Sequence, residues 1–179
     1  MALFQRHLTL AIAFMPNVFQ GETKPAADAR FAIVVARYNE AITRKLLDGA
    51  IETLIERGVQ DTAIDVAWVP GAWELPLVAR EFALGSEYDA IICLGAVIRG
   101  ETTHDQHINT QVSQSLGQIA LDQETPVLFG VLTCNTYEQA EARAGGAVGN
   151  KGSECALAAL EMASLLARIC ERDGGKFGF

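Results

Sequence analysis

The sequence predicts an α/β fold of three layers, in which a four-stranded parallel sheet carries helices on both faces. Four short apolar runs support this prediction, and each is followed by residues with helical spacing. Such alternation indicates a parallel sheet, because parallel strands are joined by helical crossovers. Runs without polar interruptions are typical of strands that are buried on both faces. The four runs are residues 31–36, 64–69, 90–97 and 127–133.

The helix after the first run has the clearest pattern. Apolar side chains recur between Ile42 and Ile55 with the spacing of one helix face. Asn39 suits the N-cap of this helix, and Gly58 suits its end.

Helical patterns also follow the other three runs. The second helix contains Pro76 in its first turn, where proline is tolerated, and the third has apolar residues at 108–119. A short helix is expected at about 136–144, with a capping box that starts at Asn135. The last helix carries apolar residues over 157–169. Because crossovers are right-handed, these elements predict a doubly wound, flavodoxin-like sandwich.

The chain has the length and composition of one globular domain. It has 179 residues, of which half are hydrophobic and a fifth charged, as in ordinary soluble domains. No repeat, low-complexity tract or linker divides the pattern. We therefore expect a single domain over residues 25–179, preceded by an N-terminal extension over residues 1–24.

Charge and motif content argue against several functions. The formal net charge of −8 is unsuited to a nucleic-acid surface. The apolar run at residues 8–15 is far shorter than the ~20 residues that cross a bilayer, so no membrane span is expected. Four cysteines without a C-x-x-C pair favour the reducing cytoplasm. His104 and His107 without a third ligand are poor evidence for a metal, and no dinucleotide or Walker motif is present.

Polar and aromatic residues follow all four predicted strands. In open parallel sheets, ligands bind beyond the carboxyl ends of the strands. The segments at this edge are residues 37–39, 70–74, 98–104 and 133–135. Their convergence predicts a binding site there.

Residues 100–104 combine a helix start with a histidine. Free backbone N–H groups at a helix start bind anions, and the imidazole of His104 suits proton transfer near neutral pH. Taken alone, residues 100–103 favour an ordinary Thr-capped helix start over an anion site. For His104 alone, a solvated or capping histidine is as good an interpretation as a proton-transfer group.

Aromatic and basic residues near this edge allow two readings each. Tyr38 and Trp73 fit core packing, but a ring directly after a buried strand is placed to stack on a planar ligand. Arg143 and Lys151 flank a glycine-rich turn, and the spacing alone favours a solvated loop for them.

Five segments together resemble the lumazine synthase family, over residues 30 to about 166. They occur in the order in which the family has them. The segments are residues 31–39, 68–76, 94–104, 129–133 and 143–152.

The resemblance implies a reaction without a metal or a cofactor. It is the condensation of 5-amino-6-(D-ribitylamino)uracil with 3,4-dihydroxy-2-butanone 4-phosphate, which gives 6,7-dimethyl-8-ribityllumazine, phosphate and water. Imine formation, phosphate elimination and ring closure need proton transfer and substrate orientation.

The resemblance also implies roles for particular residues. His104 matches the proton-transfer histidine, and Glu154 is placed to orient it. Tyr38 matches the ring that stacks on the pyrimidine, and Arg143 matches the cation that partners the phosphate.

Asp105 departs from the family, which usually has an aromatic residue there. It either helps to orient the imidazole or is a first-turn acid favoured by the helix dipole. The implied substrate contacts are Tyr38, Ala72, Trp73, Glu74, Ala96, Val97, Ile98, Gly100, Glu101, Thr102, Phe129, Arg143 and Lys151.

The family resemblance extends to assembly. Its members form pentamers, and in some of them twelve pentamers form an icosahedral shell of 60 subunits. Phe129 and Lys151 match positions that a neighbouring subunit contributes. The link at residues 145–152 has no insertion and resembles that of shell-forming members. Riboflavin synthase is a candidate partner protein.

The N-terminus carries a separate expectation. Residues 18–21 resemble the stretch that pairs with a neighbour's sheet in the family, and Met15 stands where the family usually begins. Residues 1–14 are therefore expected to be dispensable.

Two other classes stay open beside the enzyme. One is a non-catalytic flavin- or lumazine-binding protein on the same scaffold, and the other is a structural shell protein. The binding protein would keep Tyr38 and Trp73 but lose the phosphate site or His104, whereas this sequence keeps both.

Overall fold

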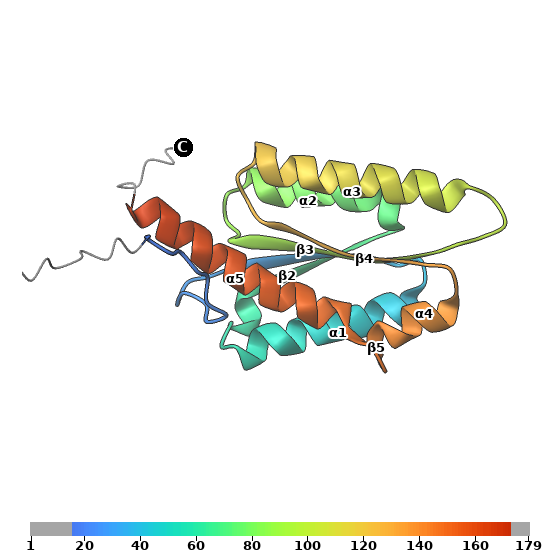
Figure 1. The fold of residues 1–179 in the computed structure, drawn as a ribbon, viewed down its shortest axis with the longest axis horizontal. Coiled ribbons are helices and arrows are strands. Elements are labelled where there is room, and N and C mark those ends of the chain that lie inside the picture. The colour runs from blue at the N-terminus through green and yellow to red at the C-terminus, as the bar shows by residue number, and fades with distance from the viewer. Residues whose placement is uncertain (1–15, 173–179) are drawn as a thin grey trace, which may run out of the picture.

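A computed structural model describes residues 16–172 and confirms the predicted α/β architecture (Figure 1). Four parallel strands form one sheet in the order β2-β1-β3-β4. Helices α2 and α3 cover one face, whereas α1 and α5 cover the other. The strands are β1 (Phe31–Ala36), β2 (Ile64–Val69), β3 (Ala90–Ile98) and β4 (Val127–Cys134). The main helices are α1 (Glu40–Glu56), α2 (Leu75–Leu84), α3 (His104–Asp122) and α5 (Lys151–Arg172).

The two central strands explain the uninterrupted apolar runs of the sequence. Every residue of β1 is buried, and so are eight of the nine residues of β3. Phe31 and Ile33 pack in the layer of α1 and α5, while Ala32 and Val34 pack in the layer of α2 and α3. Alternate residues of one strand therefore support both layers.

The ends of α1 agree in part with the expectation. Gly58 follows the helix with φ +100, a conformation that favours glycine, and its N–H donates to the carbonyl of Ile55 at 2.9 Å. Asn39 is the N-cap residue, but its side chain does not cap the helix. Its Nδ2 donates instead to the carbonyl of Ala96 at 2.9 Å.

The short helix α4 (Tyr137–Ala142) has a different cap from the predicted one. Thr136, not Asn135, is the N-cap, and its Oγ1 accepts from the N–H of Gln139 at 3.4 Å. The Gln139 side chain in turn accepts from the N–H of Asn135 at 2.9 Å. The prediction was wrong by one residue, because Thr136 is the last extended residue before the helix.

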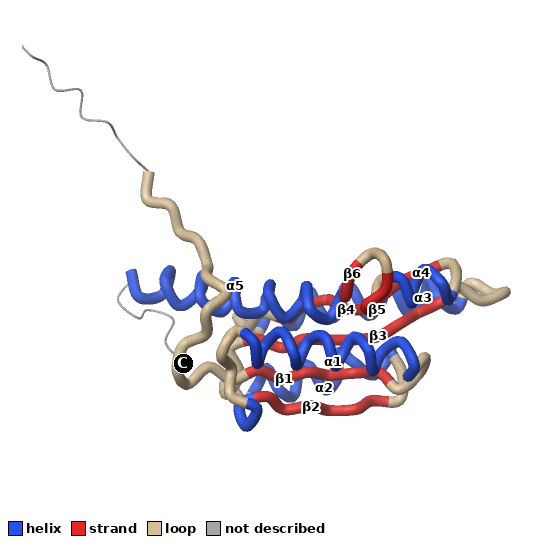
Figure 2. Tube along the Cα trace, turned by 90° about the horizontal axis from the view of Figure 1, so that it is seen from below, coloured by secondary structure: helices blue, strands red, loops and turns tan. Residues whose placement is uncertain are grey.

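The glycine-rich link before α5 forms a small hairpin. Strands β5 (Ala144–Gly146) and β6 (Gly149–Asn150) pair antiparallel, and Figure 2 shows this hairpin beside α5. Lys151 is consequently the first residue of α5 rather than part of a loop.

The segment before β1 lies against α5 and α1 of the same chain. The N–H of Glu22 donates to Ser164 Oγ at 3.1 Å, and its carboxylate pairs with Arg168 at 2.7 Å. Thr23 accepts from Arg57 at 2.8 Å. Pairing of residues 18–21 with a neighbour's sheet stays a prediction, and the expectation for residues 1–14 and Met15 lies outside the described residues. Within residues 16–172, no helix is long and apolar enough to cross a membrane.

Candidate active site

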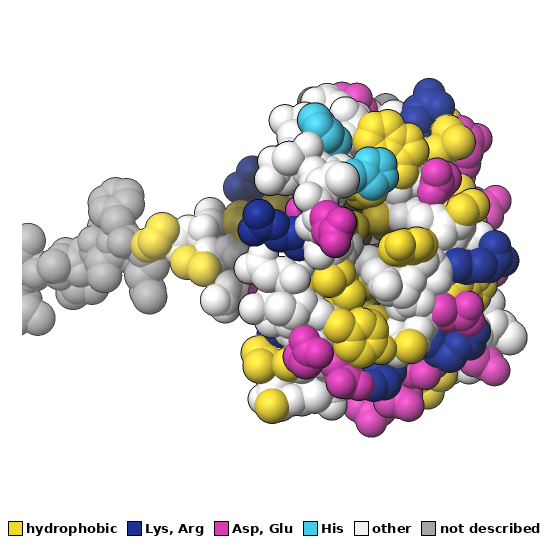
Figure 3. Space-filling model, turned by 90° about the vertical axis from the view of Figure 1, so that its right-hand side faces the viewer, with side chains coloured by type: hydrophobic (Ala, Val, Ile, Leu, Met, Phe, Trp, Pro, Cys, Tyr) yellow, Lys and Arg dark blue, Asp and Glu magenta, His cyan; other side chains and the backbone are white. Residues whose placement is uncertain are grey.

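A cavity of about 490 Å³ lies at the carboxyl ends of β1, β2 and β3. Its size and mixed lining are typical of a site for a small molecule. Figure 3 views the molecule from this side and shows hydrophobic side chains gathered beside histidine and acidic ones. The lining residues are Tyr38, Pro70, Gly71, Ala72, Trp73, Glu74, Ala96, Val97, Ile98, Gly100, Thr102, His104, Asp105 and Ile108.

Tyr38 is held at the cavity by backbone hydrogen bonds. The N–H of Arg37 donates to Val69 at 2.8 Å, and that of Tyr38 donates to Pro70 at 3.1 Å. The Asn39 side chain ties the same turn to β3. Tyr38 as a whole nevertheless stays 73% exposed, so the structure fixes its backbone and leaves its side chain accessible to a ligand.

Trp73 follows the carboxyl end of the neighbouring strand β2, in the short 3₁₀ turn of residues Ala72–Glu74. The Glu74 carboxylate accepts from the N–H of Gly71 at 2.9 Å and so closes this turn. Trp73 remains 54% exposed. Two exposed aromatic rings at one cavity offer stacking surfaces for a planar heterocycle.

The third wall of the cavity is the start of α3. The helix begins at His104, and its N-cap residue Thr103 makes no side-chain capping bond. The N–H of His104 faces the Thr102 hydroxyl at a long 3.4 Å. The first turn thus offers backbone donors to an anion, with an exposed imidazole beside them.

Ile108 also lines the cavity, and the resemblance did not assign it. It lies one helical turn beyond His104, where positions i and i+4 share a face. That spacing is the sequence signal which would have found it.

Five of the predicted site residues do not line this cavity within one chain: Glu101, Phe129, Arg143, Lys151 and Glu154. Phe129 belongs to the edge strand β4 and is 38% exposed. Glu101 is exposed in the loop before α3.

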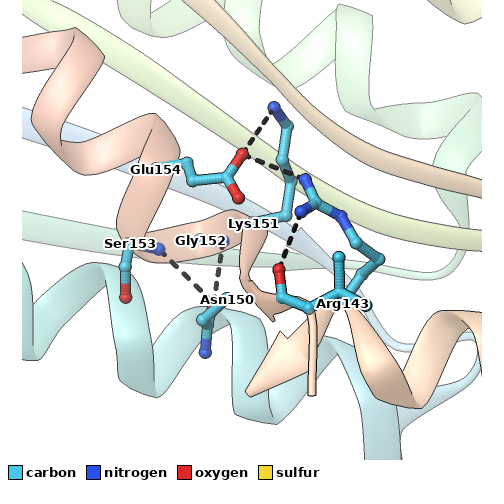
Figure 4. A network of polar contacts seen from close by, with 7 residues as sticks. Arg143, Asn150, Lys151, Gly152, Ser153 and Glu154 are labelled. Carbon is cyan, nitrogen blue, oxygen red and sulfur yellow. Dashed lines mark hydrogen bonds and ion pairs between the residues drawn. The ribbon is translucent and has the colours of Figure 1, made fainter. Parts of the chain in front are cut away.

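The other three form a charged cluster beside the hairpin, which Figure 4 shows. Glu154 Oε2 accepts from Arg143 at 3.0 Å and from Lys151 Nζ at 3.1 Å. Arg143 also donates to the carbonyl of Val148 at 3.0 Å. Burial raises the pKa of Glu154, but the hydrogen bonds from Arg143 and Lys151 outweigh it and the pKa is lowered. One ionised carboxylate between two cations leaves the cluster with an excess positive charge.

The start of α5 positions this cluster. The side chain of Asn150 accepts from the N–H groups of Gly152 and Ser153 at 2.8 and 3.4 Å, and it donates to the carbonyl of Lys45 at 2.8 Å. Asn150 therefore caps α5 and ties it to α1, which fixes the direction of Lys151 and Glu154.

No group of three or more histidine, cysteine or acidic side chains is arranged to hold a metal in residues 16–172. The described cluster partners of Glu154 are Arg143 and Lys151, so its contact with His104 stays a prediction.

Comparison with known proteins identifies the family. The model of the 6,7-dimethyl-8-ribityllumazine synthase family matches residues 28–167. A protein of Desulfotalea psychrophila described as 6,7-dimethyl-8-ribityllumazine synthase is 52% identical over 152 residues, which cover 85% of this chain and 97% of that protein. The resemblance found in the sequence is confirmed over the same part of the chain. This chain therefore belongs to the 6,7-dimethyl-8-ribityllumazine synthase family.

Proposed function

We propose that this protein condenses 5-amino-6-(D-ribitylamino)uracil with 3,4-dihydroxy-2-butanone 4-phosphate in the cavity at the strand ends, and so makes 6,7-dimethyl-8-ribityllumazine for riboflavin biosynthesis. The observation that carries the proposal is the union of two exposed rings, a helix start and His104 in one cavity of a chain from this family. A binding protein without activity needs the rings but neither the histidine nor the anion site.

Different residues of the cavity wall bind the two substrates in this proposal. Tyr38 and Trp73 are placed to hold the pyrimidine ring, with residues 72–74 and 96–98 along its edge and ribityl chain. Gly100, Glu101 and Thr102 lead into α3, where backbone donors suit the phosphate. His104 lines the same cavity at the start of α3 and moves protons during imine formation and ring closure.

The electrostatics of the cavity favour a site shared between two chains. Within the described residues, its lining holds the carboxylates of Glu74 and Asp105 but no lysine or arginine. A phosphate dianion is repelled by such a lining. The cluster of Arg143, Lys151 and Glu154 carries the missing positive charge but does not line the cavity of its own chain. We propose that a neighbouring subunit supplies this cluster together with Phe129.

A closed ring of subunits with one repeated interface satisfies this geometry. We propose a pentamer, and a 60-subunit shell as the larger assembly. Analytical ultracentrifugation measures the mass of the assembly and so distinguishes the pentamer from the shell.

Subunit mixing tests the shared site. His104→Ala and Arg143→Ala proteins are dissociated, mixed in equal amounts and reassembled. If cavity and cluster come from different chains, about one quarter of the sites in a randomly mixed ring regain both groups. Activity should rise toward that fraction of wild type, while each variant reassembled alone stays low. No gain on mixing would place both residues in one chain's site.

The phosphate role of Arg143 predicts a selective kinetic defect. Arg143→Ala should raise KM for the butanone phosphate roughly 10–100-fold, because a charge-assisted hydrogen bond to the phosphate is lost. KM for the pyrimidine should change much less. Steady-state kinetics with each substrate varied in turn measure both values. Arg80→Ala is the matched control, since Arg80 pairs only with its exposed neighbour Glu81 among the described residues. Equal losses for both substrates in Arg143→Ala would point to an assembly defect instead.

The rate at which the lumazine absorbance band appears separates enzyme from binding protein, because only the enzyme forms lumazine faster than the two substrates condense without a catalyst.

We further propose a cytoplasmic location and an encounter with riboflavin synthase, which consumes the product. The free state of all four cysteines supports a reducing compartment.

A further inference from the structure

Of the two described carboxylates that line the cavity, only that of Asp105 has an oxygen that is buried and without a hydrogen-bond partner. It lines the cavity in the first turn of α3, next to His104. Its Oδ1 is buried and has no hydrogen-bond partner among the described residues. A buried carboxylate oxygen without a donor destabilises the chain, because it has lost water and gained nothing in exchange.

Neither Glu74 nor His104 donates a hydrogen bond to the carboxylate of Asp105. Glu74, the other carboxylate in the lining, is bound by the N–H of Gly71. No hydrogen bond or ion pair joins Asp105 to His104 in residues 16–172. Successive helix positions point about 100° apart, which separates the two side chains. The structure therefore does not support the idea that Asp105 orients the imidazole.

Three buried side-chain polar atoms lack a partner in residues 16–172, and Asp105 Oδ1 is the one whose residue lines the cavity. Such an atom in a native protein is expected to meet water, an ion or a ligand. The donor that Asp105 lacks is then expected from a ligand in the cavity. The two substrates differ sharply as donors. The pyrimidine carries ring N–H groups, two amino groups and the hydroxyls of its ribityl chain, whereas the butanone phosphate carries one free hydroxyl beside a dianion that a carboxylate repels.

We propose that Asp105 is a specificity residue, whose carboxylate accepts a hydrogen bond from an N–H or O–H group of the ribitylaminopyrimidine. The ligand turns the carboxylate toward the cavity and replaces an unsatisfied position by a charge-assisted hydrogen bond. Asp105 thus selects the donor-rich substrate, while α3 backbone and the neighbour's cations select the phosphate. This inference rests on the proposed location of the active site.

The test compares Asp105→Ala and Asp105→Asn with Asn109→Ala in the assembled enzyme. Asn109 is a matched control, since its Oδ1 is also buried without a described partner, on the same helix one turn away, but it does not line the cavity. Binding of 5-amino-6-(D-ribitylamino)uracil alone is titrated by quenching of tryptophan fluorescence. Steady-state kinetics then give KM for each substrate.

We expect Asp105→Ala to raise Kd and KM for the pyrimidine roughly 10–100-fold, the usual range for loss of a hydrogen bond to a charged group. KM for the butanone phosphate should stay within about threefold or fall, because a repelling charge is removed. Asp105→Asn keeps an acceptor oxygen without the charge and should lie between wild type and Ala. Asn109→Ala should stay within about twofold of wild type, and ligand-free Asp105→Ala should melt no more than about 3 °C below it.

Several outcomes would overturn the inference. Unchanged pyrimidine binding in Asp105→Ala removes the residue from recognition, and an equal loss in Asn109→Ala shows a general effect on α3. A smaller assembly in Asp105→Ala means that a neighbouring chain, not the substrate, provides the donor. Failure of the wild-type protein itself to bind the pyrimidine or to form lumazine would instead contradict the proposed function.

Discussion

Replacing His104 by alanine is expected to slow lumazine formation by roughly 10–10⁴-fold while the protein still assembles, the upper end being typical of a positioned acid or base. The imidazole lines the cavity and is exposed to it. His104 is the only histidine among the described residues that line the cavity, and no lysine or cysteine lies there to move a proton in its place. The lower end of the range applies if orientation dominates, since an amine and a ketone condense slowly without a catalyst.

His107→Ala is the matched control for this variant. His107 is exposed one turn further along the same helix and does not line the cavity. Its removal should leave kcat within about twofold of wild type. Steady-state kinetics and size-exclusion chromatography of both variants decide the matter. Wild-type turnover by His104→Ala would remove this residue from the mechanism, and equal losses in both variants would indicate damage to α3.

The sheet was predictable because burial on both faces leaves a strong record in the sequence. The predicted first two strands agree with β1 and β2, and the other two end one residue later than expected. The helix caps were less predictable. Asn39 has the residue type of an N-cap, yet a tertiary partner, the carbonyl of Ala96, takes its side chain. Such a partner lies 57 positions away, and local pattern does not reveal it.

Contacts between strands that are distant in sequence also escaped prediction. Asp65 of β2 accepts from Arg30 Nη2 and from the hydroxyl of Tyr88, both at 2.8 Å, across the amino ends of three strands. The hydrogen bonds from Tyr88 and then Arg30 hold the pKa of Asp65 below its usual range. These residues are ordinary surface types by spacing, and only the strand order brings them together.

The candidate site also contains residues that the sequence alone predicts and residues that it does not. One general rule, that ligands lie at the carboxyl ends of parallel strands, suffices to assign Tyr38, Trp73 and His104 to one edge of the sheet from sequence alone. The same rule says nothing of Arg143 and Lys151, because they flank a hairpin outside the sheet. The resemblance alone selected them and Glu154, and the structure adds that the Glu154 carboxylate pairs with both cations.

The largest effect on stability is expected from Gly152→Ala. Gly152 is the second residue of α5, at the point where this helix crosses α1. An added Cβ would lie 2.7 Å from the carbonyl carbon of Leu46 and closer still to its oxygen. The two nearest atoms belong to the backbone of Leu46 and cannot turn aside as a side chain could, so α1 and α5 must separate. Alanine's helix propensity offsets only ~1 kcal/mol of this strain.

We therefore expect Gly152→Ala to lower the free energy of unfolding by about 3 kcal/mol or more, a large part of a typical domain's 5–15 kcal/mol. Gly117→Ala on α3 is the matched control, because a Cβ there meets nothing within 4 Å. That variant should gain up to about 1 kcal/mol, as glycine is a poor helix former. Urea denaturation at equal subunit concentration measures both, since assembly makes apparent stability depend on concentration. The displaced start of α5 should also scatter the cluster of Arg143, Lys151 and Glu154, so any folded Gly152→Ala protein should bind the butanone phosphate poorly. Wild-type stability in Gly152→Ala would show that α1 and α5 do not pack as closely in solution as their contact at Leu46 requires.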